Sequence, residues 1–299
     1  MNISIRIILA LIFFLQFNVS KCNANSVLKV NHNYGFFSCC SVRLCAILSY
    51  FNENKQLPQF VDSSESFGWY KHEEKNNSDI TYDYFENNTT DEISFFKNID
   101  HHHWNDQFSN YKKLDYEALH PFIKKYFTPT PEILTIVEFL EDKYNVIDYK
   151  NVCALFYRGN DKITETQLCG YGEILEKART IQTKNPDIIF LIQSDETEFI
   201  ELMTQEFSNS FYFKDEIRHI RKNDSAQVDV MNLSDKDRNY YFSKYYLAIT
   251  IVMSKCNTIV CGSGNCSIWI MFYRNNANNV YQYLNGEWFI PNQLKPFTF

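Results

Sequence analysis

Glycine is scarce in this sequence. It occurs 8 times in 299 residues, whereas an average content of about 7% would give roughly 21. Asparagine is plentiful, and it can form many of the turns because it tolerates the left-handed backbone conformation. The glycines that remain are therefore expected to mark positions that accept no side chain: Gly35, Gly68, Gly159, Gly170, Gly172, Gly262, Gly264 and Gly286.

An excess of basic residues is also lacking. Lys and Arg number 29 against 36 Asp and Glu, which gives a formal charge of −7. Because no basic stripe offsets this charge, we exclude nucleic-acid binding as a function class. With 45% hydrophobic and 22% charged residues, the chain can build a packed core and is not disordered as a whole. Its 299 residues make one large domain or two compact ones.

Several motifs that carry chemistry are missing. The sequence has no Cys-x-x-Cys pair, no Walker loop and no Gly-x-Ser-x-Gly elbow, which argues against zinc, thioredoxin-like, P-loop and hydrolase sites. The run His101-His102-His103 invites comparison with a metal site, but adjacent residues do not share one face. We expect these histidines in a surface turn, and we expect no bound metal.

Residues 1–24 have the pattern of a secretory signal peptide. Arg6 gives the positive start, residues 7–17 are apolar apart from Gln16, and Cys22-Asn23-Ala24 forms a cleavage site of small residues. An uncleaved membrane anchor is the alternative, although the apolar run ends near Asn18, short of the roughly 20 residues that a span needs. We expect the protein in the lumen of the endoplasmic reticulum or Golgi apparatus, or outside the cell, with no membrane span beyond such an anchor.

Glycosylation sequons and cysteines agree with this route. The sequons begin at Asn76, Asn87, Asn88, Asn223, Asn232 and Asn265. Without Cys22, eight cysteines remain, and an even number in an oxidising compartment permits disulfides. The alternative is that these cysteines are buried free thiols in strands, as Cys153 and Cys261 would be.

The N-terminal half, residues 25–148, is predicted to be a Rossmann-like domain with an irregular insertion. Its opening has βαβ character, with strands at Val27–Val30 and Gln59–Val61 around a helix at Ser38–Phe51. Residues 62–130 are polar and aromatic with little periodicity, which is typical of a functional loop or insertion. Thr130-Pro131-Glu132 then begins a helix.

The C-terminal half, residues 149–299, alternates regularly between strands and helices. We predict strands at 152–157, 187–193, 210–213, 258–261 and 279–283, and helices at 171–183, 196–207, 242–255 and 267–274. This alternation predicts a parallel, doubly wound α/β sheet. Ligands of such sheets bind beyond the carboxyl ends of the strands, and three strands here end in polar clusters.

The first cluster is Arg158-Gly159-Asn160-Asp161-Lys162. Arg158 suits bidentate recognition of a phosphate, Lys162 supplies a point charge, and Asp161 can orient either cation. Gly159 lets backbone amides approach an anion. The alternative for this cluster is a surface loop of ion pairs.

The other two clusters each open a helix. Ser194 and Asp195 either cap the helix that follows them or face a nucleotide, and both can hold together. The segment Gly262-Ser263-Gly264-Asn265 forms an anion cradle at a helix N-terminus or a tight turn without a ligand. Glycosylation of Asn265 would conflict with a buried site.

In this order, the clusters resemble the GDP-fucose-dependent fucosyltransferases of GT-B fold. That family includes the α-1,6-fucosyltransferases, the nodulation fucosyltransferases and, more distantly, the protein O-fucosyltransferases. The resemblance is carried by residues 157–162, similar to the family's Arg-x-x-Asp-Lys motif, by 190–196 and by 253–263. Residues 33–38, which include Gly35, carry a weaker similarity.

The resemblance implies two Rossmann-like halves with the donor site in the C-terminal half. Arg158 would hold the diphosphate of a nucleotide sugar with Lys162 nearby, and fucose would pass with inversion to a glycan or glycoprotein hydroxyl without a metal or cofactor. The residues that would line the nucleotide are Gly35, Gly159, Asp161, Ser194, Asp195, Ser263, Gly264 and Asn265. Aromatic residues of the N-terminal half suit stacking on an acceptor's sugar rings.

Two positions depart from the family pattern. Glu165 is the carboxylate nearest the first motif and the candidate general base, but relatives place their Glu one residue later, where this chain has Thr166. Relatives often carry an Asp at the position of Ile249 or Thr250. These departures support an alternative function, a non-catalytic lumenal module that binds a glycan or a nucleotide.

Overall fold

The computed structural model describes residues 27–87, 93, 97–222 and 236–291. The predicted signal peptide and the sequons at Asn88, Asn223 and Asn232 lie outside these residues. No helix within the described ranges is long and apolar enough to cross a membrane.

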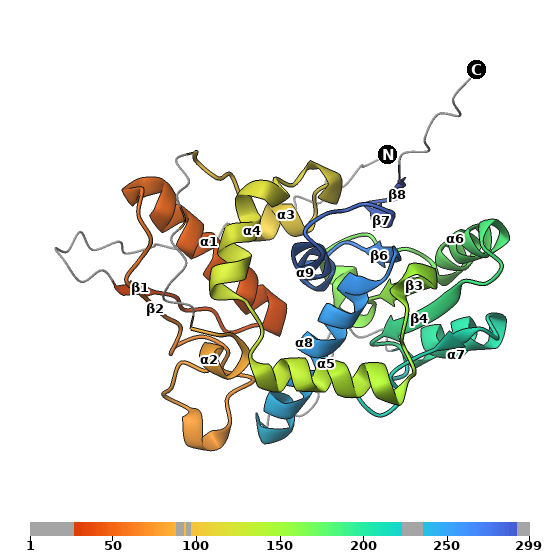
Figure 1. Ribbon diagram of the computed structural model, residues 1–299, viewed down its shortest axis with the longest axis horizontal. Coiled ribbons are helices and arrows are strands. Elements are labelled where there is room, and N and C mark those ends of the chain that lie inside the picture. The colour runs from red at the N-terminus through yellow and green to blue at the C-terminus, as the bar shows by residue number, and fades with distance from the viewer. Residues whose placement is uncertain (1–26, 88–92, 94–96, 223–235, 292–299) are drawn as a thin grey trace, which may run out of the picture.

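The C-terminal half is built on one six-stranded sheet (Figure 1). Its strand order is β5 (Ser210–Phe211), β4 (Ile189–Ser194), β3 (Val152–Tyr157), β6 (Thr258–Gly262), β7 (Val280–Leu284) and β8 (Glu287–Phe289). All neighbouring pairs are parallel except β7 and β8, which are antiparallel. The predicted parallel, doubly wound sheet is therefore confirmed, and only the short edge strand β8 was missed.

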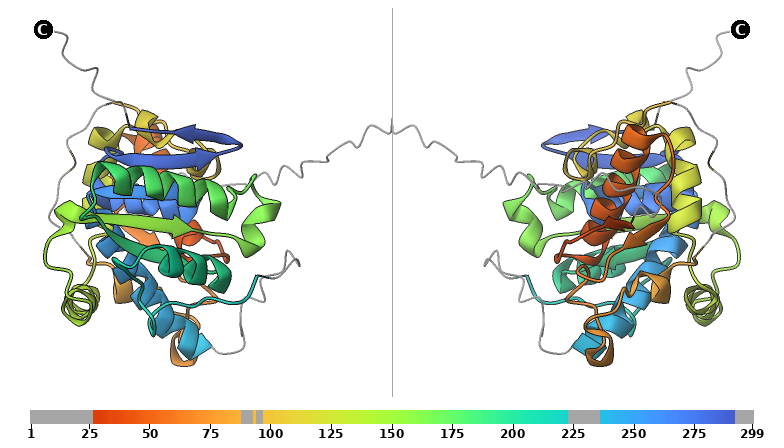
Figure 2. Two further views of the ribbon diagram at one scale, coloured as in Figure 1. Left: turned by 90° about the vertical axis from the view of Figure 1, so that its right-hand side faces the viewer. Right: turned by 90° about the vertical axis from the view of Figure 1, so that its left-hand side faces the viewer.

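Helices cover both faces of this sheet. Figures 1 and 2 show α6 (Tyr171–Lys184) and α7 (Thr197–Glu206) on one face, with α8 (Lys236–Lys255) and α9 (Asn265–Arg274) on the other. All six residues of β3 are buried, because a central parallel strand has no face exposed to water. Chain order reverses at the β3–β6 pair, which makes this the switch point where such sheets bind ligands.

Strand register brings the polar clusters together. Tyr157 pairs with Ser194, and Phe156 pairs with Cys261. The residues that follow these pairs leave the sheet at the same edge, so the first cluster lies between the second and the third. This confirms the expectation that all three meet at the carboxyl ends of the strands.

The N-terminal half is mostly helical. β1 (Val27–Lys29) and β2 (Phe60–Asp62) form a two-stranded parallel sheet, and α1 (Phe36–Asn54) connects them, so the predicted βαβ unit is confirmed. The described residues of this half hold no further strand, so it contains one such unit in place of a complete Rossmann-like sheet. A division into two domains near residue 148 stays a prediction.

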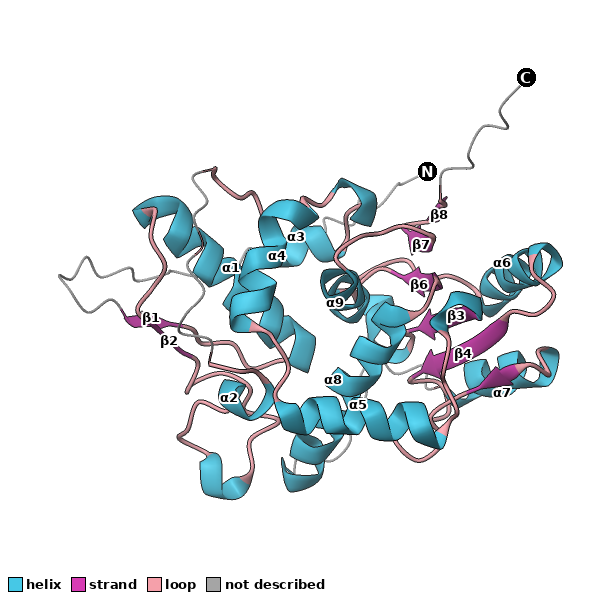
Figure 3. Cartoon of the chain, in the orientation of Figure 1, coloured by secondary structure: helices cyan, strands magenta, loops and turns pink. Residues whose placement is uncertain are grey.

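Short helices replace the irregular insertion predicted for residues 62–130 (Figure 3). The clearest omission is α4 (Tyr116–Tyr126), which Asp115 caps by accepting a hydrogen bond from Ala118 N–H at 3.1 Å. α5 (Pro131–Lys143) begins after Thr130 as predicted. The other short elements of this segment are η1 (Glu73–Lys75), α2 (Thr81–Tyr84), α3 (His103–Gln107) and η2 (Tyr111–Lys113), while η3 (Tyr149–Asn151) and η4 (Asn160–Thr164) lie in the C-terminal half.

The two halves share one hydrophobic core. Trp269 of α9 is fully buried, and its ring lies 4.7 Å from Phe127 and 6.1 Å from Phe37, measured between centroids. Its indole N–H donates to Ser41 Oγ of α1 at 2.9 Å. The eight cysteines of the described part are free thiols, seven of them buried, so the structure shows the second of the two alternatives for them.

Candidate active site

A cleft of about 550 Å³ opens between the carboxyl ends of the C-terminal strands and the N-terminus of α1. Seven of the predicted site residues line it: Gly35, Arg158, Asp161, Lys162, Glu165, Asp195 and Asn265. A side chamber of about 150 Å³ shares Arg158 and Asp195 with the cleft and is also lined by Ser194. Ser263 and Gly264 line neither space and border a much narrower pocket beside Arg158.

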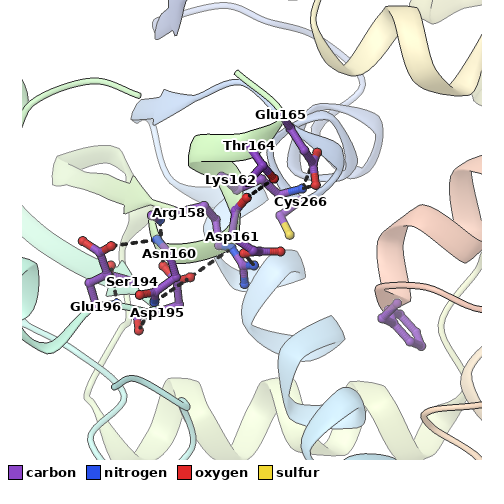
Figure 4. Close-up of polar contacts among 12 residues, drawn as sticks. Arg158, Asn160, Asp161, Lys162, Thr164, Glu165, Ser194, Asp195, Glu196 and Cys266 are labelled. Carbon is purple, nitrogen blue, oxygen red and sulfur yellow. Dashed lines mark hydrogen bonds and ion pairs between the residues drawn. The ribbon is translucent and has the colours of Figure 1, made fainter. Parts of the chain in front are cut away.

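Arg158 lies at the centre of the site (Figure 4). Its Nε is 3.5 Å from Asp195 Oδ2, and its Nη2 is 3.1 Å from Asp161 Oδ1, with 29% of the side chain exposed. Burial disfavours the charged guanidinium, but the Asp195 and Asp161 carboxylates outweigh this effect and raise the pKa of Arg158 well above its ordinary value. Arg158 is therefore a permanent cation on the cleft wall.

A carboxylate of this protein leaves no space for a side chain at Gly159. Its N–H donates to Asp195 Oδ1 at 2.9 Å, and the Asn160 N–H donates to Glu196 Oε1 at 2.7 Å. A Cβ on Gly159 would lie 2.0 Å from that Glu196 oxygen. We expected glycine here so that backbone amides could bind an external anion, but Asp195 and Glu196 of this protein accept the hydrogen bonds from these amides instead.

Lys162 and Glu165 form a tight pair. Lys162 Nζ donates to both Glu165 oxygens at 2.7 Å, and both side chains line the cleft. Glu165 is thus in place to contact a ligand. Acting as a general base would require it to release the ammonium group.

Ser194 does not cap α7. The residue before that helix is Glu196, whose side chain makes no capping hydrogen bond. Ser194 Oγ instead accepts from the Glu196 N–H at 3.0 Å, and Ser194 is 1% exposed. The capping hypothesis was therefore wrong, and the hydroxyl shapes the turn that aims Asp195 at Arg158.

The third cluster is engaged inside the protein. Gly264, with φ of +154°, donates its N–H to the hydroxyl of buried Tyr111 at 2.9 Å. Ser263 Oγ donates to the Tyr283 carbonyl at 2.9 Å. Two donors of the anion cradle expected here, the Ser263 hydroxyl and the Gly264 N–H, are therefore engaged inside the protein, and the cradle itself stays a prediction.

Asn265 belongs to the same turn but reaches the cleft. Its Oδ1 accepts from Ser41 Oγ at 2.7 Å, and the residue is 7% exposed. A glycan on this sequon would have no room in the folded protein. The hydrogen bond to Ser41 joins the third cluster to α1.

The sequence led us to expect aromatic residues of the N-terminal half near an acceptor, but it did not single out the residues on the cleft wall opposite Arg158. This wall carries the aromatic side chains His32, Tyr34, Trp69, His103 and Trp104. Burial lowers the pKa of His32 to about 4, and burial with the neighbouring histidines lowers that of His103 to about 4. The strand-end rule that found Arg158 also indicates His32, which follows β1, but it was applied only to the C-terminal strands.

The histidine triplet is not a simple surface turn. His101 Nδ1 lies 2.6 Å from Asp106 Oδ2, and the His101 side chain is almost fully buried. His102 caps α3, accepting a hydrogen bond from the Asn105 N–H. Among the described residues, no group of three or more His, Cys, Asp or Glu side chains could hold a metal ion.

Comparison with known proteins places this site in a known fold. No protein-family model matches the sequence, and no curated protein matches it. The structure is similar to NodZ α-1,6-fucosyltransferase soaked with GDP-fucose (TM-score 0.57, 10% identity, 90% of this chain and 100% of that chain).

Two further crystal structures of the same enzyme agree. NodZ co-crystallized with GDP gives a TM-score of 0.57 at 11% identity, over 90% of this chain and 99% of that one. Fucosyltransferase NodZ from Bradyrhizobium gives 0.57 at 12% identity, over 90% and 100%. The resemblance found in the sequence is thereby confirmed at the level of fold: the chain has a mixed α/β fold with parallel sheets, similar to that of the NodZ fucosyltransferase.

Proposed function

We propose that this protein is a GT-B-like glycosyltransferase that moves fucose from GDP-fucose to a hydroxyl of a glycan or glycoprotein in the secretory pathway. One observation carries the proposal. Arg158 stands at the switch point of the parallel sheet, in a cleft of about 550 Å³ lined by both halves of a NodZ-like fold.

The donor's diphosphate would bind at Arg158 and Lys162. Asp161 and Glu165 orient these cations in the structure as it stands, and the guanidinium and ammonium groups each have further N–H donors from which phosphate oxygens can accept. As the sugar–phosphate bond breaks, negative charge grows on the departing diphosphate, and fixed cations stabilise it. The same two side chains supply the charge that a divalent cation supplies elsewhere.

The side chamber suits the nucleoside. Phe156, Phe242 and Ile249 give it apolar walls, and it opens beside Arg158. Gln193 lines it as well, and its buried Oε1 has no hydrogen-bond partner among the described residues. A nucleobase offers a flat apolar face to these walls and an N–H donor to the Gln193 oxygen.

A non-catalytic nucleotide-binding module is the second candidate. Two observations favour it: Lys162 occupies both oxygens of Glu165, and Ile249 lines the side chamber where related enzymes often carry an Asp. Both candidates place GDP at Arg158 and differ only in turnover.

The experiment is a measurement of GDP release from GDP-fucose, with and without a panel of oligosaccharide acceptors. We expect turnover by the wild type and its loss in Arg158→Ala. Arg179→Ala is the matched control, because Arg179 pairs with Glu206 on the exposed side of α6. Binding of GDP without any turnover would establish the module, and turnover that survives in Arg158→Ala would overturn the assignment of the site.

A further inference from the structure

Transfer to a hydroxyl needs a group that takes its proton. This requirement rests on the proposed function, and the carboxylates that line the cleft do not meet it. Asp161 faces Arg158, Glu165 accepts twice from Lys162, and Asp195 accepts from the Gly159 N–H while facing Arg158. Each is held by a cation that the donor's phosphates also need.

His32 offers a base on the opposite wall. Its Nε2 lies 2.8 Å from Ser38 Oγ in the first turns of α1. Its backbone is fixed at both ends, since the N–H donates to Ser66 Oγ at 3.0 Å and the carbonyl accepts from the Phe67 N–H at 3.3 Å. When Nε2 carries the ring proton and donates it to Ser38 Oγ, Nδ1 is the nitrogen that can receive a proton.

Aromatic side chains surround His32 on the cleft wall. The Tyr34 ring lies 4.9 Å from the His32 ring, and Trp69 lies 6.1 Å beyond Tyr34. Tyr34 is 61% exposed and Trp104 is 49% exposed, although both line the cleft. Exposed rings with polar edges suit the apolar face of a sugar. Among the described residues that line the cleft, none from the N-terminal half is Lys, Arg, Asp or Glu, which matches an uncharged ligand.

We propose that this wall is the acceptor subsite, where an uncharged sugar ring packs on Tyr34 and Trp69 and its hydroxyl passes its proton to Nδ1 of His32. The acceptor oxygen then bonds to the anomeric carbon of the donor sugar. The bond from that carbon to the diphosphate oxygen breaks, and its electron pair leaves with the diphosphate. His32 becomes an imidazolium and returns the proton to solvent. Ser38 is a positioning residue that selects the tautomer.

The test compares His32→Ala and His32→Gln with the wild type in fucose transfer. General bases contribute about 10²–10⁴-fold, so we expect transfer to fall about 100-fold or more while GDP binding is unchanged. Added imidazole should restore part of the rate in His32→Ala, which a merely structural role would not allow. Trp69→Ala should raise the acceptor KM and leave the donor KM unchanged.

The matched control is His72→Ala. His72 is also half-buried, but it lines neither the cleft nor the two smaller pockets, and its Nε2 lies 3.5 Å from Asp237 Oδ1. Its loss should leave transfer largely intact. Transfer that survives in His32→Ala overturns the role of His32 alone. Wild-type protein that binds GDP without turnover overturns both this role and the proposed transfer, and wild-type protein that does not bind GDP overturns the donor site first.

Discussion

Replacing Gly159 with alanine tests how the first two clusters depend on each other. The new Cβ would lie 2.0 Å from Glu196 Oε1 and 2.3 Å from its Cδ, so the carboxylate must move. Glu196 is 1% exposed and accepts hydrogen bonds from the Asn160 N–H and the Tyr171 hydroxyl. Hydrogen bonds to a charged group contribute about 1.5–3 kcal/mol each, so losing both lowers the free energy of unfolding by about 3–6 kcal/mol.

Gly172→Ala is the control for this substitution. Gly172 lies in α6, and no atom falls within 4 Å of a Cβ placed on it. Because Gly172 lies in the first turn of the helix, alanine there should leave the free energy of unfolding unchanged or raise it by less than the roughly 1 kcal/mol of a helix interior. The assay is urea unfolding of both variants, followed by GDP titration of any folded Gly159→Ala protein. If the two variants unfold at the same urea concentration, the packing of Gly159 against Glu196 is not as described.

Two further predictions concern stability. Tyr111→Phe removes the hydroxyl that receives the Gly264 N–H, so the unfolding free energy should fall by about 1–3 kcal/mol in urea titrations; no change would mean that this amide finds another partner. The second prediction concerns His32, whose pKa burial lowers from 6.5 to about 4. Below pH 6.5 the unfolded state therefore binds a proton at this residue that the folded state does not bind. Between pH 6.5 and 4, the free energy of unfolding of the wild type should therefore fall by up to about 3 kcal/mol more than that of His32→Gln. If the free energies of unfolding of the two proteins change with pH in parallel, the imidazole is not buried and neutral as described.

The C-terminal sheet could be predicted because its strands are continuous apolar runs. Val152–Tyr157 was predicted with its observed bounds, and the other four predicted strands began or ended within two residues of theirs. A strand that is buried on both faces must be apolar along its whole length, so its sequence is easy to recognise. Edge strand β8 was missed, since its three residues follow a tight turn at Gly286 and carry no periodicity that marks a strand.

The helical part of the N-terminal half was harder to predict. α4 has an Asp115 cap and buried residues at Ala118, Leu119, Phe122 and Ile123, which is a helical pattern. Pro121 lies inside it, and proline commonly ends a helix. Polar and aromatic residues on both sides hid the pattern further.

Site residues could be found from the sequence, but their partners could not. Gly159 was rightly singled out, yet the group that forbids a side chain there is Glu196, whose position depends on β3–β4 register. The Gly264 amide is taken by Tyr111, 153 residues away. Such pairings follow from how helices and strands pack, and no local motif encodes them.

Calorimetric titration of GDP into the wild type, Arg158→Ala and Arg179→Ala tests the central claim most directly. Removing a charged hydrogen-bonding partner costs about 1.5–3 kcal/mol, so Arg158→Ala should weaken GDP binding by about 10- to 100-fold. Arg179→Ala should bind GDP as the wild type does. Equal GDP affinity in all three proteins would contradict the claim that Arg158 holds the diphosphate of a nucleotide sugar.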